Sequence, residues 1–335
     1  MDRRERLHYE ILVALQRATE PMSSAALVQC LSHLSDTLHE RTLRLHLSEL
    51  DELGLTASLG KRGRVITEKG LEELRASYVL DRVGYLSTKI DSMTYSMSFD
   101  LATRTGTVIV NAAVVDAEAL HECCSAICQV FERGLAMGNR LAIVGPGEKI
   151  GEVTIPAGKV GLCTVCSITL NGILLKHGVP TSSRFGGLLE LHEGKPRRFV
   201  EILHYDGTSI DPLEVFIRGG MTNYSGAIRD GNGLIGASFR ENPAGSRDMV
   251  VTLSERVSAI GLGAFVEIGW PDQPVLGQPV GAGRIGSIVI GGLNPVAILE
   301  ETGHHVPSRA MAGLLEYNWL RSYEDLPGLI KQHRA

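Results

Sequence analysis

Two passages in the last two-thirds of the chain share one pattern, at an offset of about 125 positions. Ala157–Gly161 reads Ala-Gly-Lys-Val-Gly, and Ala282–Gly286 reads Ala-Gly-Arg-Ile-Gly. Each is followed by a β-branched run, an Asn and a Val-Pro, and each passage closes on Gly-Leu-Leu-Glu. Such self-similarity indicates duplicated units. We therefore expect half-units at about residues 98–220 and 221–325, related by a pseudo-dyad with a pocket between them.

The length and charge of the chain limit its class. Its 335 residues leave room for two or three domains. The formal net charge is −5, so any contact with nucleic acid must come from a local patch. The N-terminus has no apolar signal core, and no apolar stretch reaches the ~18 residues of a membrane span. We expect a cytoplasmic protein without membrane contact, and its six cysteines as free thiols.

Residues 1–80 have the pattern of a winged helix-turn-helix domain, which leaves residues 81–335 for a receptor domain. Apolar residues at helical spacing predict three helices, and two short strand-like runs flank a basic glycine turn. A closing helix follows. The expected helices are Arg4–Arg17, Ala25–Leu34, Glu40–Leu53 and Glu68–Leu80, and the expected strands are Leu55–Leu59 and Val65–Thr67.

The third helix and the hairpin turn carry the side chains that could contact DNA. A helix fits the major groove, where Arg can bind guanine and Ser or Thr can bind bases or phosphates. The candidate DNA-binding residues are Arg41, Thr42, Arg44, His46, Ser48, Lys61, Arg62 and Arg64. In the alternative, this domain is a protein-docking module, and its arginines pair with Glu40 or Asp51. Because one such domain binds DNA weakly, we expect a homodimer on an inverted-repeat operator.

Strands alternate with helices in each half of the receptor region, which predicts an α/β or α+β domain. The passage Asp81–Met97 looks strand-like and is expected to couple the two domains closely. The expected strands are residues 106–111, 141–144, 199–203, 234–239, 263–268 and 285–290. The expected helices are residues 117–135, 173–177, 248–260 and 296–302.

A polar passage in the first half is the leading candidate for an effector site. Cys166, Ser167, Thr169 and Asn171 lie where a strand leads into a helix, and such a helix N-terminus can bind an anion. The second half keeps an Asn there but loses the thiol and the Thr, which indicates that the first half binds something. In the alternative, these side chains only cap the helix and its turn.

A second polar passage contains Thr208 and Asp211, just before Pro212. Ser209 or Asp211 could cap a helix that begins at the proline, and in the alternative the passage lines a pocket. Carboxylate groups of an effector would need cationic partners, for which Arg184, Arg218 and Arg240 are available.

No catalytic or metal-binding motif is present, so we expect neither an enzyme nor a resident cofactor. Cys163 and Cys166 have redox or metal spacing, but a strand points side chains at i and i+3 to opposite faces. His121, Cys123, Cys124 and Cys128 could add ligands, but these cysteines more simply fit a helix core.

Several longer motifs resemble those of the nitrogen-regulatory repressor family known as NrpR. They are residues 166–172, 207–214, 185–188 and 106–111, and the resemblance extends over essentially the whole chain. It implies a transcriptional repressor of nitrogen-assimilation genes that dimerises through its receptor domain. It also implies that 2-oxoglutarate binds the receptor and weakens operator binding.

These expectations combine into one mechanism. A small anionic metabolite binds near Ser167, Thr169 and Asn171, and an Arg supplies the positive charge. The receptor domains of the dimer then change their relative angle, and the recognition helices lose the operator spacing. Three other functions remain open: a metabolite-responsive regulator of another pathway, a protein-docking adaptor, and an enzyme fused to a DNA-binding domain.

Overall fold

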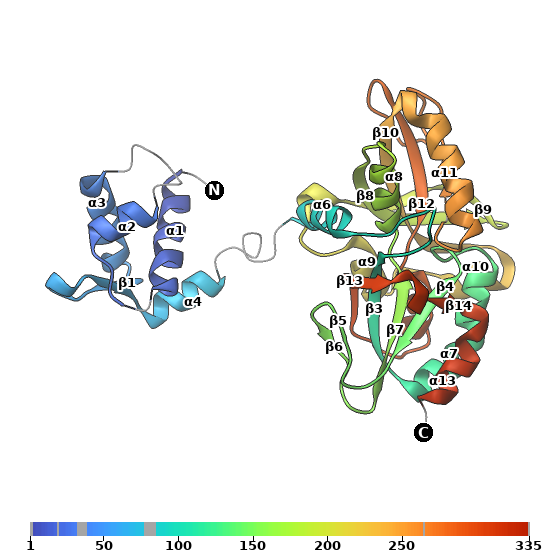
Figure 1. Cartoon of the computed structure of the whole chain (residues 1–335), viewed down its shortest axis with the longest axis horizontal. Coiled ribbons are helices and arrows are strands. Elements are labelled where there is room, and N and C mark those ends of the chain that lie inside the picture. The colour runs from blue at the N-terminus through green and yellow to red at the C-terminus, as the bar shows by residue number, and fades with distance from the viewer. Residues whose placement is uncertain (1–2, 19, 32–38, 77–84, 264, 334–335) are drawn as a thin grey trace. The chain divides into compact units, whose positions relative to one another are not determined.

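The computed structural model describes residues 3–18, 20–31, 39–76, 85–263 and 265–333. The chain divides into two compact units, Met1–Gly84 and Tyr85–Ala335 (Figure 1). The domain boundary expected between residues 80 and 81 lies outside the described residues.

The first unit has the element order of a winged helix. Its elements are α1 (Arg3–Arg17), α2 (Ser24–Cys30), α3 (Glu40–Glu52), β1 (Thr56–Ser58), β2 (Arg64–Ile66) and α4 (Glu68–Ala76). Ser23 caps α2 by accepting a hydrogen bond from the Ala26 amide at 3.2 Å. Gly54 follows α3 with φ = 72°, a conformation that favours glycine. Residues 32–34 and 77–80 of the predicted helices lie outside the described residues.

The predicted strand between the domains is wrong for the residues that the structure describes there. Leu86–Ser96 forms the helix α6. Leu86 and Ile90, one turn apart, are buried, and Met93 and Met97 continue the same apolar face. This spacing of three to four residues outweighs the short alternation at Val83–Leu86, of which residues 83 and 84 lie outside the described part.

The second unit contains two antiparallel sheets of five strands each. One follows the order β13-β3-β7-β4-β14, and the other β11-β12-β10-β8-β9. The strands are β3 (Thr107–Asp116), β4 (Arg140–Val144), β7 (Lys159–Val165), β8 (Ser182–His192), β9 (Lys195–His204), β10 (Gly233–Pro243), β11 (Phe265–Ile268), β12 (Arg284–Ile290), β13 (Ser308–Glu316) and β14 (Arg321–Ser322). A small separate hairpin pairs β5 (Lys149–Ile150) with β6 (Val153–Thr154). Antiparallel sheets covered by helices make this an α+β unit.

The remaining helices of this unit include two, Tyr224–Asp230 and Leu326–Gln332, that the sequence did not predict, and one that begins earlier than predicted. They are α7 (Ala117–Glu132), α8 (Thr169–Lys176), α9 (Pro212–Arg218), α10 (Tyr224–Asp230), α11 (Arg247–Ala259), α12 (Asn294–Glu301) and α13 (Leu326–Gln332). Helix α8 begins four residues before the predicted start at Ile173. Its first residue, Thr169, is anchored there because its hydroxyl donates to the Ile109 carbonyl at 3.0 Å.

Strands are exchanged between the two halves of the second unit. Along the chain, β3-α7-β4-β7-α8-β8 and β10-α11-β11-β12-α12-β13 follow the same order of strands and helices. The final strand of each series pairs with the first strand of the other, so β8 lies beside β10 and β13 lies beside β3. The order β-α-β-β-α-β with such a sheet is that of a split β-α-β unit. Neither half completes its sheet alone.

Two hydrophobic cores result from this exchange, and each receives helices from both halves. One core contains Leu120 and Ile127 of α7 together with Ile298 of α12. The other contains Ile173 of α8 and Leu253 of α11. The central strands lie between the cores with both faces buried, which explains their continuous apolar runs. In the described part of the chain, no helix has the length and apolar character needed to cross a membrane.

Candidate DNA-binding face and candidate effector site

Most of the predicted DNA-binding side chains on α3 face solvent. Four of them are exposed: Arg41, Thr42, Arg44 and Ser48. The opposite face of the helix packs into the core through Leu43, Leu47 and Leu50. Arg44 forms an ion pair with Glu40, one turn earlier on the same helix. This pair is exposed and stabilises little, so Arg44 can exchange it for a phosphate or a base.

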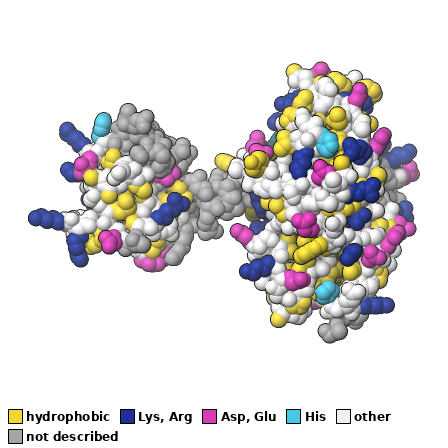
Figure 2. Space-filling view, viewed as in Figure 1, with side chains coloured by type: hydrophobic (Ala, Val, Ile, Leu, Met, Phe, Trp, Pro, Cys, Tyr) yellow, Lys and Arg dark blue, Asp and Glu magenta, His cyan; other side chains and the backbone are white. Residues whose placement is uncertain are grey.

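The hairpin divides its three cations between two environments. Lys61 and Arg62 are exposed in the short 3-10 turn Gly60–Arg62. Figure 2 shows Lys and Arg side chains projecting at the hairpin end of this unit. Arg64 differs, because its Nε and a terminal nitrogen both lie 2.9 Å from Oδ2 of Asp51. This ion pair ties the wing to α3, which makes Arg64 a structural residue in this state.

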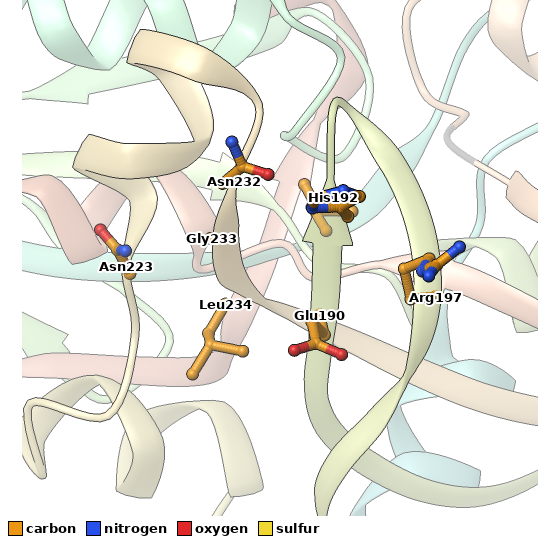
Figure 3. A pocket seen from close by; sticks show the side chains of 8 residues that line it. Glu190, His192, Arg197, Asn223, Asn232, Gly233 and Leu234 are labelled. Carbon is orange, nitrogen blue, oxygen red and sulfur yellow. The ribbon is translucent and has the colours of Figure 1, made fainter.

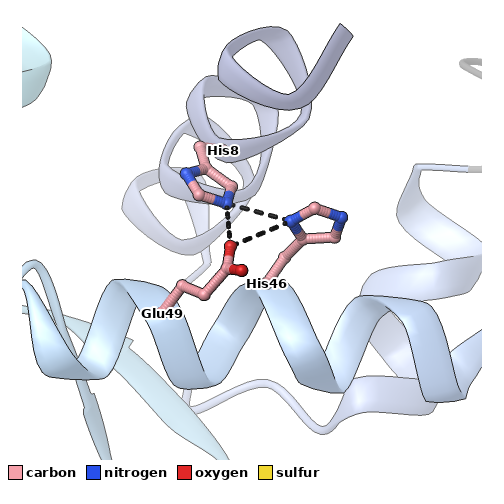
Figure 4. Close-up of side chains that lie close together, drawn as sticks. All are labelled: His8, His46 and Glu49. Carbon is pink, nitrogen blue, oxygen red and sulfur yellow. Dashed lines mark hydrogen bonds and ion pairs between the residues drawn. The ribbon is translucent and has the colours of Figure 1, made fainter.

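His46 does not share the exposed face of α3. Its Nδ1 lies 3.0 Å from Nε2 of His8 on α1 and 3.3 Å from Oε2 of Glu49 (Figure 4). The same Glu49 oxygen lies 3.1 Å from Nε2 of His8. Burial and the neighbouring His46 lower the pKa of His8 below its ordinary value. The structure therefore directs His46 toward α1, away from the predicted base contacts.

A small cavity lies in the second unit where two corresponding turns meet. One is the turn between β7 and α8, and the other is the turn between β12 and α12. The cavity measures about 20 Å³, enough for one water molecule. Its lining comes from both halves: Asn111, Cys166, Ser167, Ile168, Tyr205, Asp211, Leu213, Ser238, Gly291, Gly292, Leu293 and Ala310.

Arg240 of β10 lies beside this cavity and is only 1% exposed. One terminal nitrogen donates to the Ser167 carbonyl at 2.8 Å and to Oδ1 of Asn171 at 2.7 Å. The other donates to the Ser238 hydroxyl at 3.3 Å. Its Nε is buried without a hydrogen-bond partner, and no carboxylate of the described residues forms an ion pair with it. A buried cation held only by neutral groups is costly, so the site favours an anion.

Two ionisable groups line the cavity. Burial and the nearby Glu214 carboxylate raise the pKa of Asp211 to about 7. Its Oδ1 accepts a hydrogen bond from the Leu213 amide at 2.9 Å, so the predicted cap of the helix at Pro212 is confirmed. Burial also raises the pKa of Tyr205, whose hydroxyl stays protonated. Near neutral pH, both groups can therefore donate a hydrogen bond to a ligand.

The structure brings together some of the predicted effector residues. Cys166, Ser167 and Asp211 line the cavity. Asn171 lies behind it, where it accepts from Arg240 and donates to the Ser183 hydroxyl at 2.9 Å. Asn171 thus positions the buried cation without lining the cavity.

Three other predicted side chains are bound elsewhere. Thr169 exchanges hydrogen bonds with the backbone of Ile109, accepting from its amide at 3.1 Å. The hydroxyl of Thr208 donates to the Ile210 carbonyl at 2.9 Å within its own turn. Arg184 is half exposed and lies 3.7 Å from Glu241. A Ser or Thr hydroxyl often hydrogen-bonds to the protein backbone instead of a ligand, and the sequence does not distinguish these two roles.

Arg218 and the cysteines have structural environments. Arg218 forms an ion pair with the buried Glu214 at 3.4 Å and donates to the Ser308 carbonyl at 2.6 Å. Cys163 and Cys166 are free thiols in the core, and burial raises their pKa values to about 12 and about 11. Thiols with such pKa values are poor nucleophiles and poor ligands at neutral pH.

The second of the two turns carries glycines where the first carries Cys166 and Ser167. A Cβ on Gly292 would lie 2.3 Å from the Val165 carbonyl oxygen and 2.5 Å from Nδ2 of Asn111. The glycine is therefore needed because the backbones of the two turns approach each other closely. The absence of a side chain at Gly292, opposite Ser167, reflects this contact, and by itself it does not indicate that the first half binds a ligand.

Sequence reasoning missed three polar residues of the cavity. Asn111 of β3 and Ser238 of β10 occupy corresponding positions, opposite Thr164 and Val289 in their sheets. Tyr205 follows β9. A polar residue within an otherwise apolar strand was the available signal, because buried polar groups need partners or a function.

A larger pocket, of about 470 Å³, lies at the surface near the β8–β9 hairpin (Figure 3). Glu190, His192 and Arg197 come from the hairpin, and Asn223 and Asn232 lie across from it. Both asparagines stabilise turns: Asn223 caps α10, and Asn232 accepts from the Glu193 amide at 3.1 Å. Since no predicted effector residue lines this pocket, the smaller cavity beside Arg240 is the better candidate site.

Comparisons with known proteins match both units. Residues 83–322 match the family model of the NrpR regulatory domains NRD1 and 2, and residues 9–74 match the ribonuclease R winged-helix domain. The chain is 31% identical to the global nitrogen regulator NrpRI of Methanosarcina mazei over 95% of its own length and 98% of the relative.

Longer relatives and a solved structure agree with this match. The chain is 32% identical, over 97% of its length, to the global nitrogen regulator NrpR of Methanocaldococcus jannaschii, and it covers 56% of that relative. A crystal structure of a nitrogen repressor-like protein from Methanococcus jannaschii has a TM-score of 0.60 at 28% identity. It covers 71% of this chain and 98% of its own. The chain belongs to the NrpR family.

Proposed function

We propose that this protein is a DNA-binding transcriptional repressor of nitrogen-assimilation genes, and that it acts in the cytoplasm. The relatives named as global nitrogen regulators support the pathway. The winged-helix match and the exposed cations on α3 and the hairpin support contact with DNA. Because each chain offers a single recognition helix, the protein binds an inverted-repeat operator as a homodimer.

The second unit is a receptor for a small anionic metabolite, which we take to be 2-oxoglutarate. The observation that carries this proposal is the buried guanidinium of Arg240, which lacks a carboxylate partner and keeps an unsatisfied Nε. A carboxylate of the ligand would supply the missing charge. Tyr205 and protonated Asp211 would donate hydrogen bonds to it, since both line the adjacent cavity.

Ligand binding at this site requires the two turns to move apart. A cavity of about 20 Å³ has room for a water molecule and not for a five-carbon dianion. Gly292 and Val165, which lie on opposite sides of the junction, must therefore separate. Such a change can alter DNA affinity only if the ligand prefers the open state over the operator-binding state. A coupling free energy of ~1–3 kcal/mol is typical.

The same arrangement supports an origin of the receptor by duplication. The two halves, at about residues 98–220 and 221–325, share the series β-α-β-β-α-β and exchange the final strand of that series, β8 or β13. The cavity lies between corresponding positions of the halves, Asn111 with Ser238 and Ser167 with Gly292. A ligand that binds at such a junction contacts both halves, so its affinity depends on how the halves pack together.

Fluorescence anisotropy tests the proposal. The full chain is titrated onto DNA from upstream of its own gene, at fixed salt, with and without 2-oxoglutarate, and with glutarate as the control. The proposal predicts specific binding that 2-oxoglutarate weakens and glutarate does not. Specific binding that ignores 2-oxoglutarate would indicate a regulator of another pathway. Absence of specific binding would overturn the repressor and favour a docking adaptor.

A further inference from the structure

Three potential metal ligands converge between the first and third helices of the winged-helix unit. Nε2 of His8 comes from α1, while Nδ1 of His46 and Oε2 of Glu49 come from α3 (Figure 4). His46 and Glu49 are three positions apart, so they share one face of α3. All three side chains are partly buried, at 17%, 14% and 26% exposed. The sequence did not predict this cluster, because His8 lies 38 positions away from His46.

The spacing of the three atoms fits a tetrahedral metal ion. The pairs are 3.0 Å, 3.1 Å and 3.3 Å apart. With metal–ligand distances of about 2.0–2.2 Å, two ligands of a tetrahedral zinc ion lie about 3.3–3.6 Å apart. A shift of a few tenths of an ångström would bring the three atoms to ideal positions around one ion.

Hydrogen bonding alone does not satisfy this triangle. If His8 donates from Nε2 to both neighbours, the Nδ1 lone pair of His46 faces the carboxylate oxygen of Glu49. If both ring nitrogens carry protons, two N–H groups face each other instead. A cation bound by all three atoms would satisfy the two nitrogen lone pairs and the carboxylate oxygen at the same time.

We propose that His8, His46 and Glu49 bind one divalent transition-metal ion, with Zn²⁺ as the best-fitting class. Two imidazole nitrogens and one carboxylate oxygen are common ligands of Zn²⁺, whereas Mg²⁺ and Ca²⁺ prefer oxygen ligands. One tetrahedral position remains for water. Arg4 pairs with the other carboxylate oxygen of Glu49 at 2.9 Å and orients the group, since oxygen Oε2 then points to the histidines.

The ion would fasten α1 to the helix that carries the predicted base contacts. His46 and Glu49 face His8 of α1, so the ion would lie on the side of α3 that packs against α1. It would fix the tilt of α3 against α1 and thereby raise the share of molecules with a recognition helix ready to bind. The zinc concentration would then change the DNA affinity of the first unit independently of any ligand bound to the second unit.

Zinc binding is measured on untagged full-length protein. The chain is stripped with a chelator and titrated with ZnCl₂ in a calorimeter, and bound zinc is counted by mass spectrometry. We expect one ion per chain at this site. His8→Gln and Glu49→Gln should each weaken its binding about tenfold or more. The matched control is His39→Gln, which removes an exposed histidine just before α3 and should bind like the parent.

Hydrogen exchange locates the ion independently of affinity. Zn²⁺ should slow amide exchange in peptides from α1 and α3 of the parent and of His39→Gln. In His8→Gln, amide exchange with Zn²⁺ should equal amide exchange of the same variant without zinc. Each variant is checked for folding by its zinc-free exchange pattern. The proposal is overturned if the parent binds no zinc, or if His8→Gln and Glu49→Gln keep both the affinity and the protection.

Discussion

The two corresponding turns of the second unit meet at one place with opposite compositions. The turn between β7 and α8 carries Cys166 and Ser167, while the turn between β12 and α12 carries Gly291 and Gly292. Because the backbones approach closely at Gly292, that position has no room for a Cβ. A difference in polar content between two corresponding turns can therefore result from packing. The buried charge of Arg240 is the stronger sign of a ligand site.

Replacing Gly292 with alanine should produce the largest effect. The new Cβ would lie 2.3 Å from a backbone oxygen that cannot move without separating the turns. We expect a loss of about 3 kcal/mol in the free energy of unfolding. Urea unfolding followed by circular dichroism measures it. Ser167→Ala, at the corresponding position of the other turn, is the control and should change stability by less than ~0.5 kcal/mol. Equal losses in both variants would refute the packing explanation.

Neutralising Arg240 should weaken ligand binding. Arg240→Gln keeps a hydrogen-bond donor but removes the charge, so affinity for 2-oxoglutarate should fall by about 10- to 100-fold. Isothermal titration calorimetry measures the change. Arg184→Gln removes an exposed charge nearby and should change affinity less than ~3-fold. If the two variants bind alike, the anion site lies elsewhere.

The raised pKa of Asp211 predicts a pH dependence of stability. The folded pKa of about 7 is above the ordinary value of 3.8. Between about pH 4 and pH 7, the native state therefore holds a proton that the unfolded chain has already lost. The contribution of this group to the free energy of unfolding falls as pH rises through that window. We expect ~1–2 kcal/mol, allowing for the partial exposure of the side chain.

Asp211→Asn isolates that contribution. Asparagine still caps α9, so the variant should keep the fold while losing the pH-dependent term. The stability of the parent minus that of the variant, measured by urea unfolding, should decrease from pH 4 to pH 7 and then level off. A difference that rises with pH would contradict the assignment.

Oxidation should have the smallest effect. Burial raises the pKa values of Cys163 and Cys166 to about 12 and about 11, so few thiolates exist at neutral pH. In a Cys30→Ser background, which removes the exposed thiol, oxidised glutathione should change 2-oxoglutarate affinity less than ~2-fold. A larger change would revive a redox role for the pair.

The sequence was sufficient for elements whose pattern is local. The helices and hairpin of the first unit and the strand at residues 284–290 follow from apolar periodicity and turn residues, whereas the strand predicted at residues 106–111 continues to residue 116. Exchange of β8 and β13 between the halves could not be predicted, because strand pairing is long-range and leaves no local signal.

The candidate site was only partly predictable for the same reason. Ser167 and Asp211 were found because they lie next to a strand–helix turn and a helix start. Arg240 was named as one of three possible cations, but its burial depends on strands β8 and β12 on either side of it. Thr169 was predicted to bind the ligand, but its hydroxyl bonds the backbone of Ile109. A sequence cannot show whether a hydroxyl hydrogen-bonds to a backbone group that is distant along the chain.

The most direct test measures how 2-oxoglutarate releases DNA from the parent and from Arg240→Gln. Both proteins are bound to the same fluorescent operator at the same salt, and the ligand concentration for half release is read from anisotropy. We expect equal DNA affinity without ligand and a half-release concentration about tenfold or more higher for the variant. Equal half-release concentrations would contradict the claim that the buried arginine at the junction of the two turns senses the metabolite.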